Sequence, residues 1–196
     1  MTNYITGYSL KAPSSKNAKI FFDNLNTQTR MTSTNTRWPK GYKKLPPRAG
    51  IIDEEEIENF DYSYFKMSPT QAQDADPILK ICLELTHEAL LDANINILKD
   101  FRGSNTGVYI GHPFSDFCGE ACKKYKKNGY ELVCGTNCMT ANRISFYYEL
   151  KGPSYTVDTA CSSSLVALNC AMSDLKSGKI SRAVVGGASL CLDVNK

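Results

Sequence analysis

Apolar residues recur along this chain with two periods, one typical of strands and the other of helices. Short apolar runs beside glycine or other small residues predict buried strands, at 107–111, 155–158 and 183–187. Apolar residues at helical spacing predict longer helices, at 76–93, 142–150 and 162–176. Because predicted strands alternate with predicted helices, the pattern indicates an α/β layered fold.

The first part of the chain carries weaker signals. In order, they predict a strand, a turn, a helix and a polar loop, at 4–10, 12–15, 18–25 and 27–50. The helix would present Ile20, Phe21 and Leu25 on its apolar side. The acidic run at 53–56 is typical of a helix N-terminus or a solvated turn.

Composition excludes several classes of protein. The apolar share of 42% and the charged share of 22% are ordinary for a globular domain. A formal net charge of +3 is too small to indicate a nucleic-acid partner, and the basic cluster at 123–127 is typical of a solvated face. No apolar run is long enough to span a membrane, and no signal peptide follows Met1. We therefore expect a cytoplasmic protein with reduced thiols, without nucleic-acid or membrane partners.

The segment with the clearest chemistry is Asp158-Thr159-Ala160-Cys161-Ser162-Ser163-Ser164. It places Cys161 at a predicted junction between a strand and a helix, where a sharp turn exposes the side chain. The positive end of the helix dipole favours the reactive thiolate, and free N–H groups there can stabilise an oxyanion. Cys161 is therefore the candidate nucleophile. The residues alone leave a structural alternative open, in which Cys161 is a small buried side chain and the serines cap the helix.

This segment resembles the active-site signature of β-ketoacyl synthases. The resemblance runs from about Tyr4 to Asn195, and its clearest matches are 76–77, 88–93, 106–111, 141–146, 152–154, 157–165 and 185–187. The loop at 37–41 and the segment at 45–50 resemble animal fatty acid synthases more than bacterial polyketide synthases.

The resemblance implies a thiolase-like, layered αβαβα fold, of which residues 1–196 would form the N-terminal half of a condensing domain. By the same resemblance, Cys161 would accept an acyl group from the phosphopantetheine arm of an acyl carrier protein. Malonyl carrier protein would then lose carbon dioxide and attack the acyl thioester. The resemblance implies no metal or redox cofactor in this domain, and a homodimer in which residues 154–159 contribute to the interface.

One departure from the family concerns histidine. The resemblance places two assisting histidines downstream of Cys161, whereas the chain ends at Lys196 and holds only His87 and His112. We expect His87 to be a helix-surface or core residue, and we assign no catalytic role to His112. We therefore expect the 196-residue chain alone to lack condensing activity, and to expose a face that a second half would cover.

Other polar motifs suggest less. Four cysteines, at 118, 122, 134 and 138, have the count of a structural zinc site, but their spacing is wider than the common two-residue knuckle. We expect Cys82, Cys170 and Cys191 to belong to the core. Asp158 is expected to make a buried structural hydrogen bond, and no phosphate-binding glycine loop is present in the sequence.

Two functions remain open from the sequence. The first is a catalytic part of a fatty acid or polyketide synthase, which the resemblance favours. The second is a non-catalytic half-domain that dimerises or binds carrier protein. A thiolase or another decarboxylating relative is disfavoured by the three serines after Cys161 and by the loop that contains Trp38.

Overall fold

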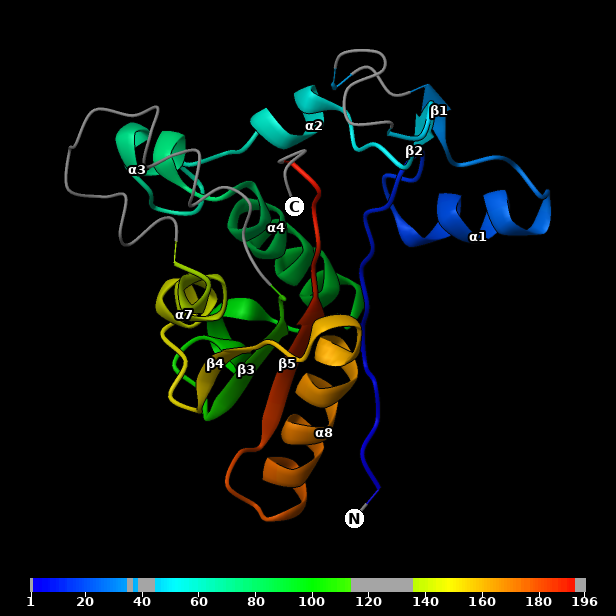
Figure 1. Cartoon of the computed structure of the whole chain (residues 1–196). Helices are drawn as coiled ribbons and strands as arrows, with labels where there is room; N and C mark the ends of the chain where they lie inside the picture. The colour runs from blue at the N-terminus through cyan, green and yellow to red at the C-terminus, as the bar shows by residue number, and fades with distance from the viewer. Residues whose placement is uncertain (1, 35–36, 39–44, 114–135, 193–196) are drawn as a thin grey trace.

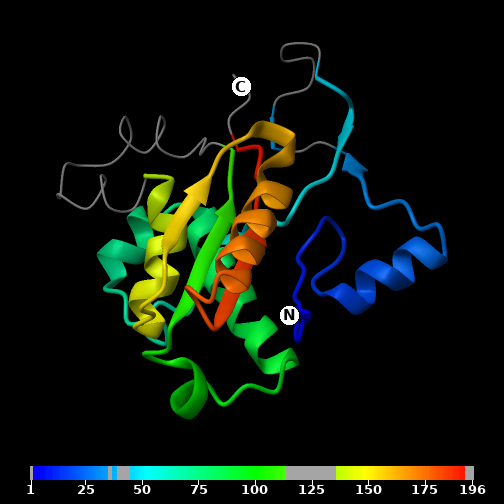
Figure 2. The ribbon, with the colours of Figure 1, turned by 90° about the horizontal axis from the view of Figure 1, so that it is seen from below.

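A parallel sheet positions the rest of the molecule. The computed structural model describes residues 2–34, 37–38, 45–113 and 136–192. The sheet has the strand order β4 (Ser154–Val157), β3 (Thr106–Gly111), β5 (Arg182–Gly187), with both neighbours parallel to β3. Helices lie on both faces of this sheet, as Figure 1 and Figure 2 show, so the predicted α/β layers are confirmed.

The helix over 77–92 forms because both of its ends are well specified. In α4 (Pro77–Asp92), Asp76 accepts the Ile78 N–H at 2.8 Å, and Pro77 occupies the first turn, where no backbone donor is needed. Ile78, Ile81 and Leu90, which recur at helical spacing in the sequence, are buried, and this supports the predicted apolar face. Leu83, outside that spacing, is buried as well.

One face of the sheet is covered by α4 and α7 (Cys138–Tyr148), and the main core lies there. Fully buried side chains from three elements meet in this core: Leu83 from α4, Val108 and Ile110 from β3, and Ile144 and Tyr148 from α7. The helix α7 begins four residues earlier than the predicted start at 142. It ends at the left-handed residue Glu149, just before the predicted stop.

The opposite face is covered by α8 (Ser163–Lys176) alone among the described helices. The residues of α8 that are buried are small: Ser163, Ala167 and Ala171, spaced four apart. The leucine and methionine positions of this helix are half-buried or exposed, and Leu165 is 70% exposed. The helix therefore contacts the sheet mainly through its small residues. Of its large apolar residues, Leu165 is uncovered, whereas Leu175 packs in part against the core.

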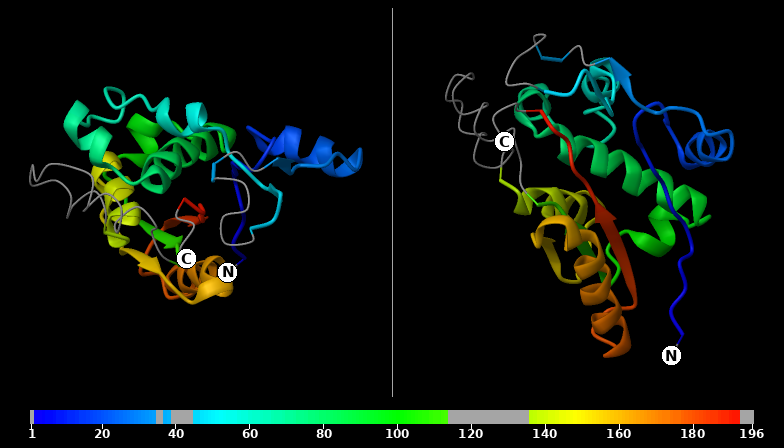
Figure 3. Two further views of the ribbon diagram at one scale, coloured as in Figure 1. Left: turned by 45° about the horizontal axis from the view of Figure 1, so that its top comes forward. Right: turned by 45° about the vertical axis from the view of Figure 1, so that its right-hand side comes forward.

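The elements before α4 form a peripheral layer. They are α1 (Ala18–Asn26), the two-stranded antiparallel pair β1 (Ser33–Thr34) and β2 (Arg48–Ala49), α2 (Glu54–Glu58) and α3 (Pro69–Asp74). The helix α1 stands apart from the sheet (Figure 3) and buries none of its residues, so its predicted apolar side is uncovered. After α4, the π-helical turn η2 (Ile97–Phe101) leads into β3.

The predicted strand at 4–10 is wrong within the described part of the chain. This segment is extended but pairs with no described strand, and it lies along α4 instead (Figure 3). The Tyr8 N–H donates to Asp92 at 3.0 Å, and a Cβ on Gly7 would lie 2.3 Å from the Ala89 carbonyl oxygen. A strand exists only where a partner strand satisfies its backbone groups, and here the Tyr8 N–H is satisfied by the Asp92 side chain of α4 instead.

Candidate active site

The candidate nucleophile lies in a tight turn between β4 and α8. The chain leaves β4 at Val157 and passes through the 3-10 turn η3 (Ala160–Ser162), which contains Cys161, before α8 begins. Ala160 has a φ of 53°, a left-handed conformation that costs an L-residue other than glycine about 1 kcal/mol or more. The Cys161 side chain is exposed, so the predicted junction that presents this thiol to solvent is confirmed.

Short side chains hold this turn closed. Ser163, which is buried, accepts the Thr159 N–H at 2.9 Å and donates to the Ala160 carbonyl at 2.7 Å. Ser162 donates to the Thr159 carbonyl at 2.7 Å and makes no side-chain cap on α8. The first turn of α8 therefore lacks a side-chain cap. The positive end of its helix dipole is directed at the turn that contains Cys161, residues 158–162, which we call the elbow.

Two glycines form the floor beneath this turn. A Cβ on Gly111, the last residue of β3, would lie 2.5 Å from the Ser164 nitrogen and 2.6 Å from the Ser163 carbonyl carbon. A Cβ on Gly187, the last residue of β5, would lie 2.6 Å from the Ser164 Cβ. These glycines let the first turn of α8 rest on the carboxyl ends of two strands. Sequence analysis missed their role, although each glycine stands at the end of a predicted strand.

Asp158 supports the turn, as expected, but from an exposed position. Its carboxylate accepts the Ala160 N–H at 3.0 Å. The hydrogen bond is structural, but the prediction that it is buried is wrong, because the residue is exposed to solvent. Asp158 therefore stabilises the left-handed residue before Cys161 without entering the core.

The two histidines lie in different environments. His87 lies on α4, where its ring contacts the Tyr64 and Tyr148 hydroxyls at 3.2 Å and 3.4 Å, and partial burial lowers its pKa. His112 follows β3 and is fully buried, with its backbone N–H donating to the Val157 carbonyl at 3.0 Å and its Nδ1 lying 3.5 Å from the Thr140 hydroxyl. His87 is a helix residue among aromatic rings, as predicted, and His112 lies at the same sheet edge as the elbow.

The other cysteines divide into two groups. Cys82 is buried in the main core, and burial raises its pKa to about 12, so its thiol stays protonated. Cys170 lies on α8 and is half-buried against the core. Cys191 is exposed in the segment after β5, so the assignment of Cys191 to the core is wrong. Its carbonyl accepts a hydrogen bond from Arg37 at 3.2 Å. Cys118, Cys122 and Cys134 lie outside the described residues, as does the basic cluster at 123–127.

Comparison with known proteins decides the family. The family model described as "Beta-ketoacyl synthase, N-terminal domain" matches residues 4–196. The chain belongs to the β-ketoacyl synthase family. This ketosynthase chain is 41% identical over 194 residues to a fatty acid synthase of Anser anser anser, and the match covers 97% of the chain and 54% of that relative. It is also 39% identical over 178 residues to a highly reducing polyketide synthase of Emericella nidulans, covering 90% of the chain and 6% of that relative.

Solved structures agree with this assignment. The ketosynthase from module 6 of the bacillaene synthase of Bacillus subtilis 168 has a TM-score of 0.80 and 30% identity. The match covers 96% of this ketosynthase chain and 32% of the solved chain. The thiolase-like α/β fold expected from the sequence is therefore confirmed. The chain spans about half the length of the goose fatty acid synthase sequence. Among the described residues, each helix is too short or too polar to cross a bilayer.

Proposed function

We propose that this chain supplies the nucleophile of a β-ketoacyl synthase that acts in fatty acid biosynthesis. The observation that carries the proposal is Cys161 itself, an exposed thiol in a strained turn at the uncapped start of α8. The identity of 41% to a fatty acid synthase supports fatty acid rather than polyketide synthesis. A ketosynthase of a polyketide synthase is the second candidate, because relatives of that kind reach 40% identity over 146 residues and a hybrid PKS-NRPS synthetase reaches 41% over 154 residues, although both matches are shorter than the 194 residues shared with the fatty acid synthase.

The first proposed step is acyl transfer. The Cys161 thiolate attacks the carbonyl carbon of an acyl thioester, and the new C–S bond forms as negative charge develops on the carbonyl oxygen. Backbone N–H groups at the start of α8 would stabilise that oxygen. Collapse of the intermediate expels the phosphopantetheine thiolate, which takes up a proton, and leaves the acyl group on the Cys161 sulfur.

The second proposed step forms the carbon–carbon bond. Malonyl carrier protein loses carbon dioxide, and the electron pair of the broken bond becomes a carbanion stabilised by the thioester. The carbanion attacks the acyl carbonyl on Cys161 and releases the thiolate. By resemblance, two histidines downstream of Cys161 assist this step, and neither His87 nor His112 matches their positions. We therefore propose that the 196-residue chain carries out acyl transfer but not condensation.

The partners follow from the same chemistry. We propose that acyl and malonyl groups arrive on the phosphopantetheine of an acyl carrier protein, and that the domain uses no metal or redox cofactor. We also propose that the protein acts in the cytoplasm. The strand β4 lies at one edge of the described sheet, which supports a homodimer in which residues 154–159 of two copies contribute to the interface.

The test separates the two steps. The purified chain is incubated with an acyl thioester of N-acetylcysteamine, and the acylated peptide is identified by mass spectrometry. We expect acylation of the peptide containing Cys161, no acylation at that position in C161A, and unchanged acylation in C138A, which removes another exposed thiol. No β-ketoacyl product should form when a malonyl thioester is added. An unacylated Cys161 in folded protein would favour the non-catalytic half-domain, and measurable condensation would contradict the division between steps.

A further inference from the structure

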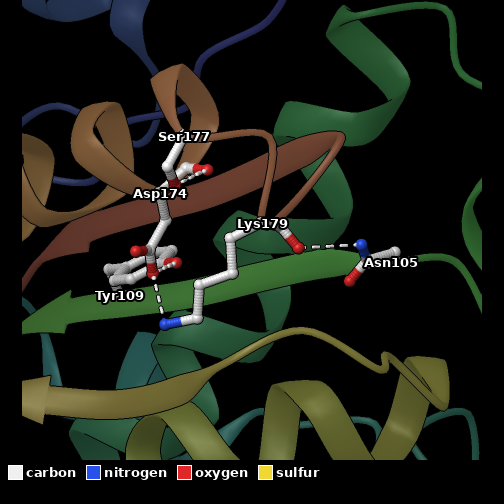
Figure 4. Close-up of polar contacts among 5 residues, drawn as sticks. All are labelled: Asn105, Tyr109, Asp174, Ser177 and Lys179. Atoms are coloured by element: carbon white, nitrogen blue, oxygen red, sulfur yellow. Dashed lines mark hydrogen bonds and ion pairs between the residues drawn. The ribbon is translucent and has the colours of Figure 1, made fainter.

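A buried tyrosine of the central strand is hydrogen-bonded to the far end of the helix that begins at the elbow. The Tyr109 hydroxyl donates to the Asp174 carboxylate at 2.7 Å, and the Lys179 ammonium lies 3.2 Å from the same oxygen (Figure 4). Tyr109 belongs to β3 and is fully buried, whereas Asp174 lies in the last turn of α8. The contact therefore joins the sheet to the helix across their interface.

The reach of Tyr109 depends on the glycine that precedes it on the same face of β3. A Cβ on Gly107 would lie 2.6 Å from the Tyr109 ring and 2.7 Å from its hydroxyl oxygen. The ring therefore lies along the strand over Gly107, and its hydroxyl is directed back toward the end of α8. Residues two apart share a face of a strand, so a larger side chain at position 107 would displace the ring.

A second tyrosine lies beside Tyr109 on the neighbouring strand. Tyr155 of β4 is the register partner of Tyr109, and their rings meet edge to face at 5.1 Å. Cys170 of α8 packs against the cluster that contains Tyr109. Cys170 and Asp174 are four residues apart and so lie on one side of α8. That side of the helix therefore faces the strand that carries Tyr109.

Asp174 also fixes the end of α8 through its backbone. Its carbonyl accepts the Lys179 N–H at 3.0 Å and the Ser177 hydroxyl at 3.1 Å. The Lys179 carbonyl accepts the Asn105 side-chain amide at 3.0 Å, which ties the loop after α8 to the residue before β3 (Figure 4). The hydrogen bond from Tyr109, more than the contact with Lys179, lowers the pKa of the Asp174 carboxyl, so the charged form accepts both donors.

We infer that Tyr109 and Asp174 are positioning residues for Cys161, because they fix α8 lengthwise on β3. At its other end the helix meets Gly111 and Gly187 in close contact and has no side-chain cap, so the glycines limit its approach to the sheet but not its position along the strands. Loss of the Tyr109–Asp174 bond lets α8 shift. The shift moves its first turn relative to Cys161 and weakens the stabilisation of the thiolate.

The test measures the reactivity of Cys161 rather than catalysis. The rate of iodoacetamide alkylation at Cys161 is followed by peptide mass spectrometry across a pH series, with the 196-residue chain. For Y109F we expect the rate at neutral pH to fall about threefold. In D174A the same change is expected, whereas D174N keeps an oxygen that accepts from Tyr109 and should retain the wild-type rate.

The matched control removes a hydroxyl from the other face of the sheet. Tyr148 is also fully buried, and its hydroxyl contacts His87 at 3.4 Å, away from α8. Y148F should leave the alkylation rate unchanged, even if it destabilises the fold as much as Y109F does in urea. A wild-type rate in folded Y109F, or an equal fall in Y148F, would overturn the inference.

The catalytic importance of Tyr109 and Asp174 rests on the proposed function of Cys161 as the nucleophile, whereas their effect on its alkylation does not. Alkylation needs no acyl substrate, so a failure of acyl transfer would sink the proposed function and leave the alkylation result standing. A normal alkylation rate in Y109F, together with normal acyl transfer in the wild-type chain, would overturn the positioning role and leave the proposed function standing. Far-UV circular dichroism of each variant verifies that the comparison concerns folded protein.

Discussion

The two faces of the β4–β3–β5 sheet are covered in different ways. On the side of α4 and α7, large apolar side chains such as Leu83, Ile144 and Tyr148 are fully buried. On the side of α8, small residues such as Ala167 and Ala171 make the contact, and Leu165 points away from it. The first face is a core complete within the described chain. The second face holds one closely packed helix, and the position of that helix on the sheet depends on glycines and a few hydrogen bonds.

The difference in burial can be tested with two leucines. L83A removes a side chain from the complete core, and we expect it to lower the free energy of unfolding by about 3 kcal/mol through lost burial and a residual cavity. L165A, on α8, should change it by less than about 0.5 kcal/mol because that side chain is 70% exposed. Urea denaturation of both variants provides the measurement. Similar losses would mean that the α8 face is covered in solution.

Two glycines at the same sheet edge sharpen the comparison. G111A places a Cβ against the backbone of Ser163 and Ser164, so α8 must move, and we expect a loss of about 2 kcal/mol. G186A faces the other side, where only the end of the Ile110 side chain lies within reach, at 2.9 Å, and a smaller loss is expected. Urea midpoints measure both losses, and alkylation of Cys161 should slow in G111A alone. Equal alkylation rates would show that α8 tolerates the shift.

Acidic residues on the two sides should respond to pH with opposite sign. The Tyr109 hydrogen bond, together with Lys179, holds the pKa of Asp174 below its ordinary value of 3.8. The stabilisation is therefore present above that value and is lost as pH falls through the lowered pKa. D174N should be less stable than wild type at neutral pH, and the difference should disappear in acid. Urea midpoints over a pH series test this, and a pH-independent difference would contradict it.

Glu84 on α4 gives the opposite case. Burial raises its pKa above the ordinary 4.5, although Lys11 lies 3.6 Å from its carboxylate. The folded state then binds its proton more tightly than the unfolded state, so stability falls as pH rises through the raised pKa. E84Q removes this fall, and its stability relative to wild type should increase from acid to neutral pH by less than about 1 kcal/mol. The same urea series measures it, and a decrease over that range would show that the Lys11 contact dominates.

The smallest effect concerns the strained residue before the nucleophile. Ala160 has a φ of 53°, so A160G should relieve strain and raise the free energy of unfolding by about 0.5 kcal/mol, after the entropy cost of glycine. N94G, after α4, changes a residue with the same φ that already tolerates this conformation, and no gain is expected. Differential scanning calorimetry resolves the pair. A loss of stability in A160G would mean that contacts of the Ala160 methyl group stabilise the fold by more than the strain costs.

Sequence patterns predicted best those elements whose signals are local. The apolar spacing of α4, with Asp76 and Pro77 at its start, and the buried run of β3 were predicted nearly to the residue. The elbow at Cys161 was also predicted, because a strand pattern runs directly into a helix pattern there through small residues. The short helix α3 was missed, although Ser68 and Gln71 form a capping box that the sequence displays.

Features that depend on distant residues were not predictable from local pattern. Residues 4–10 have the composition of a strand, but pairing is decided by neighbours elsewhere in the chain. In the same way, Cys191 follows an apolar strand yet lies exposed, because no described element covers it. The link from Tyr109 to Asp174 joins residues 65 positions apart, and no spacing rule connects them.

The strand order also has a consequence during synthesis on the ribosome. The central strand β3 is made first, whereas its two neighbours begin at Ser154 and Arg182. The nascent chain therefore carries an apolar strand with unpaired backbone groups while more than forty further residues are translated. Exposed strands of this kind are what holdase chaperones bind and what aggregates nucleate on. Slow translation after residue 111 would lengthen this exposure, so codon choice between β3 and β5 should influence the yield of folded protein.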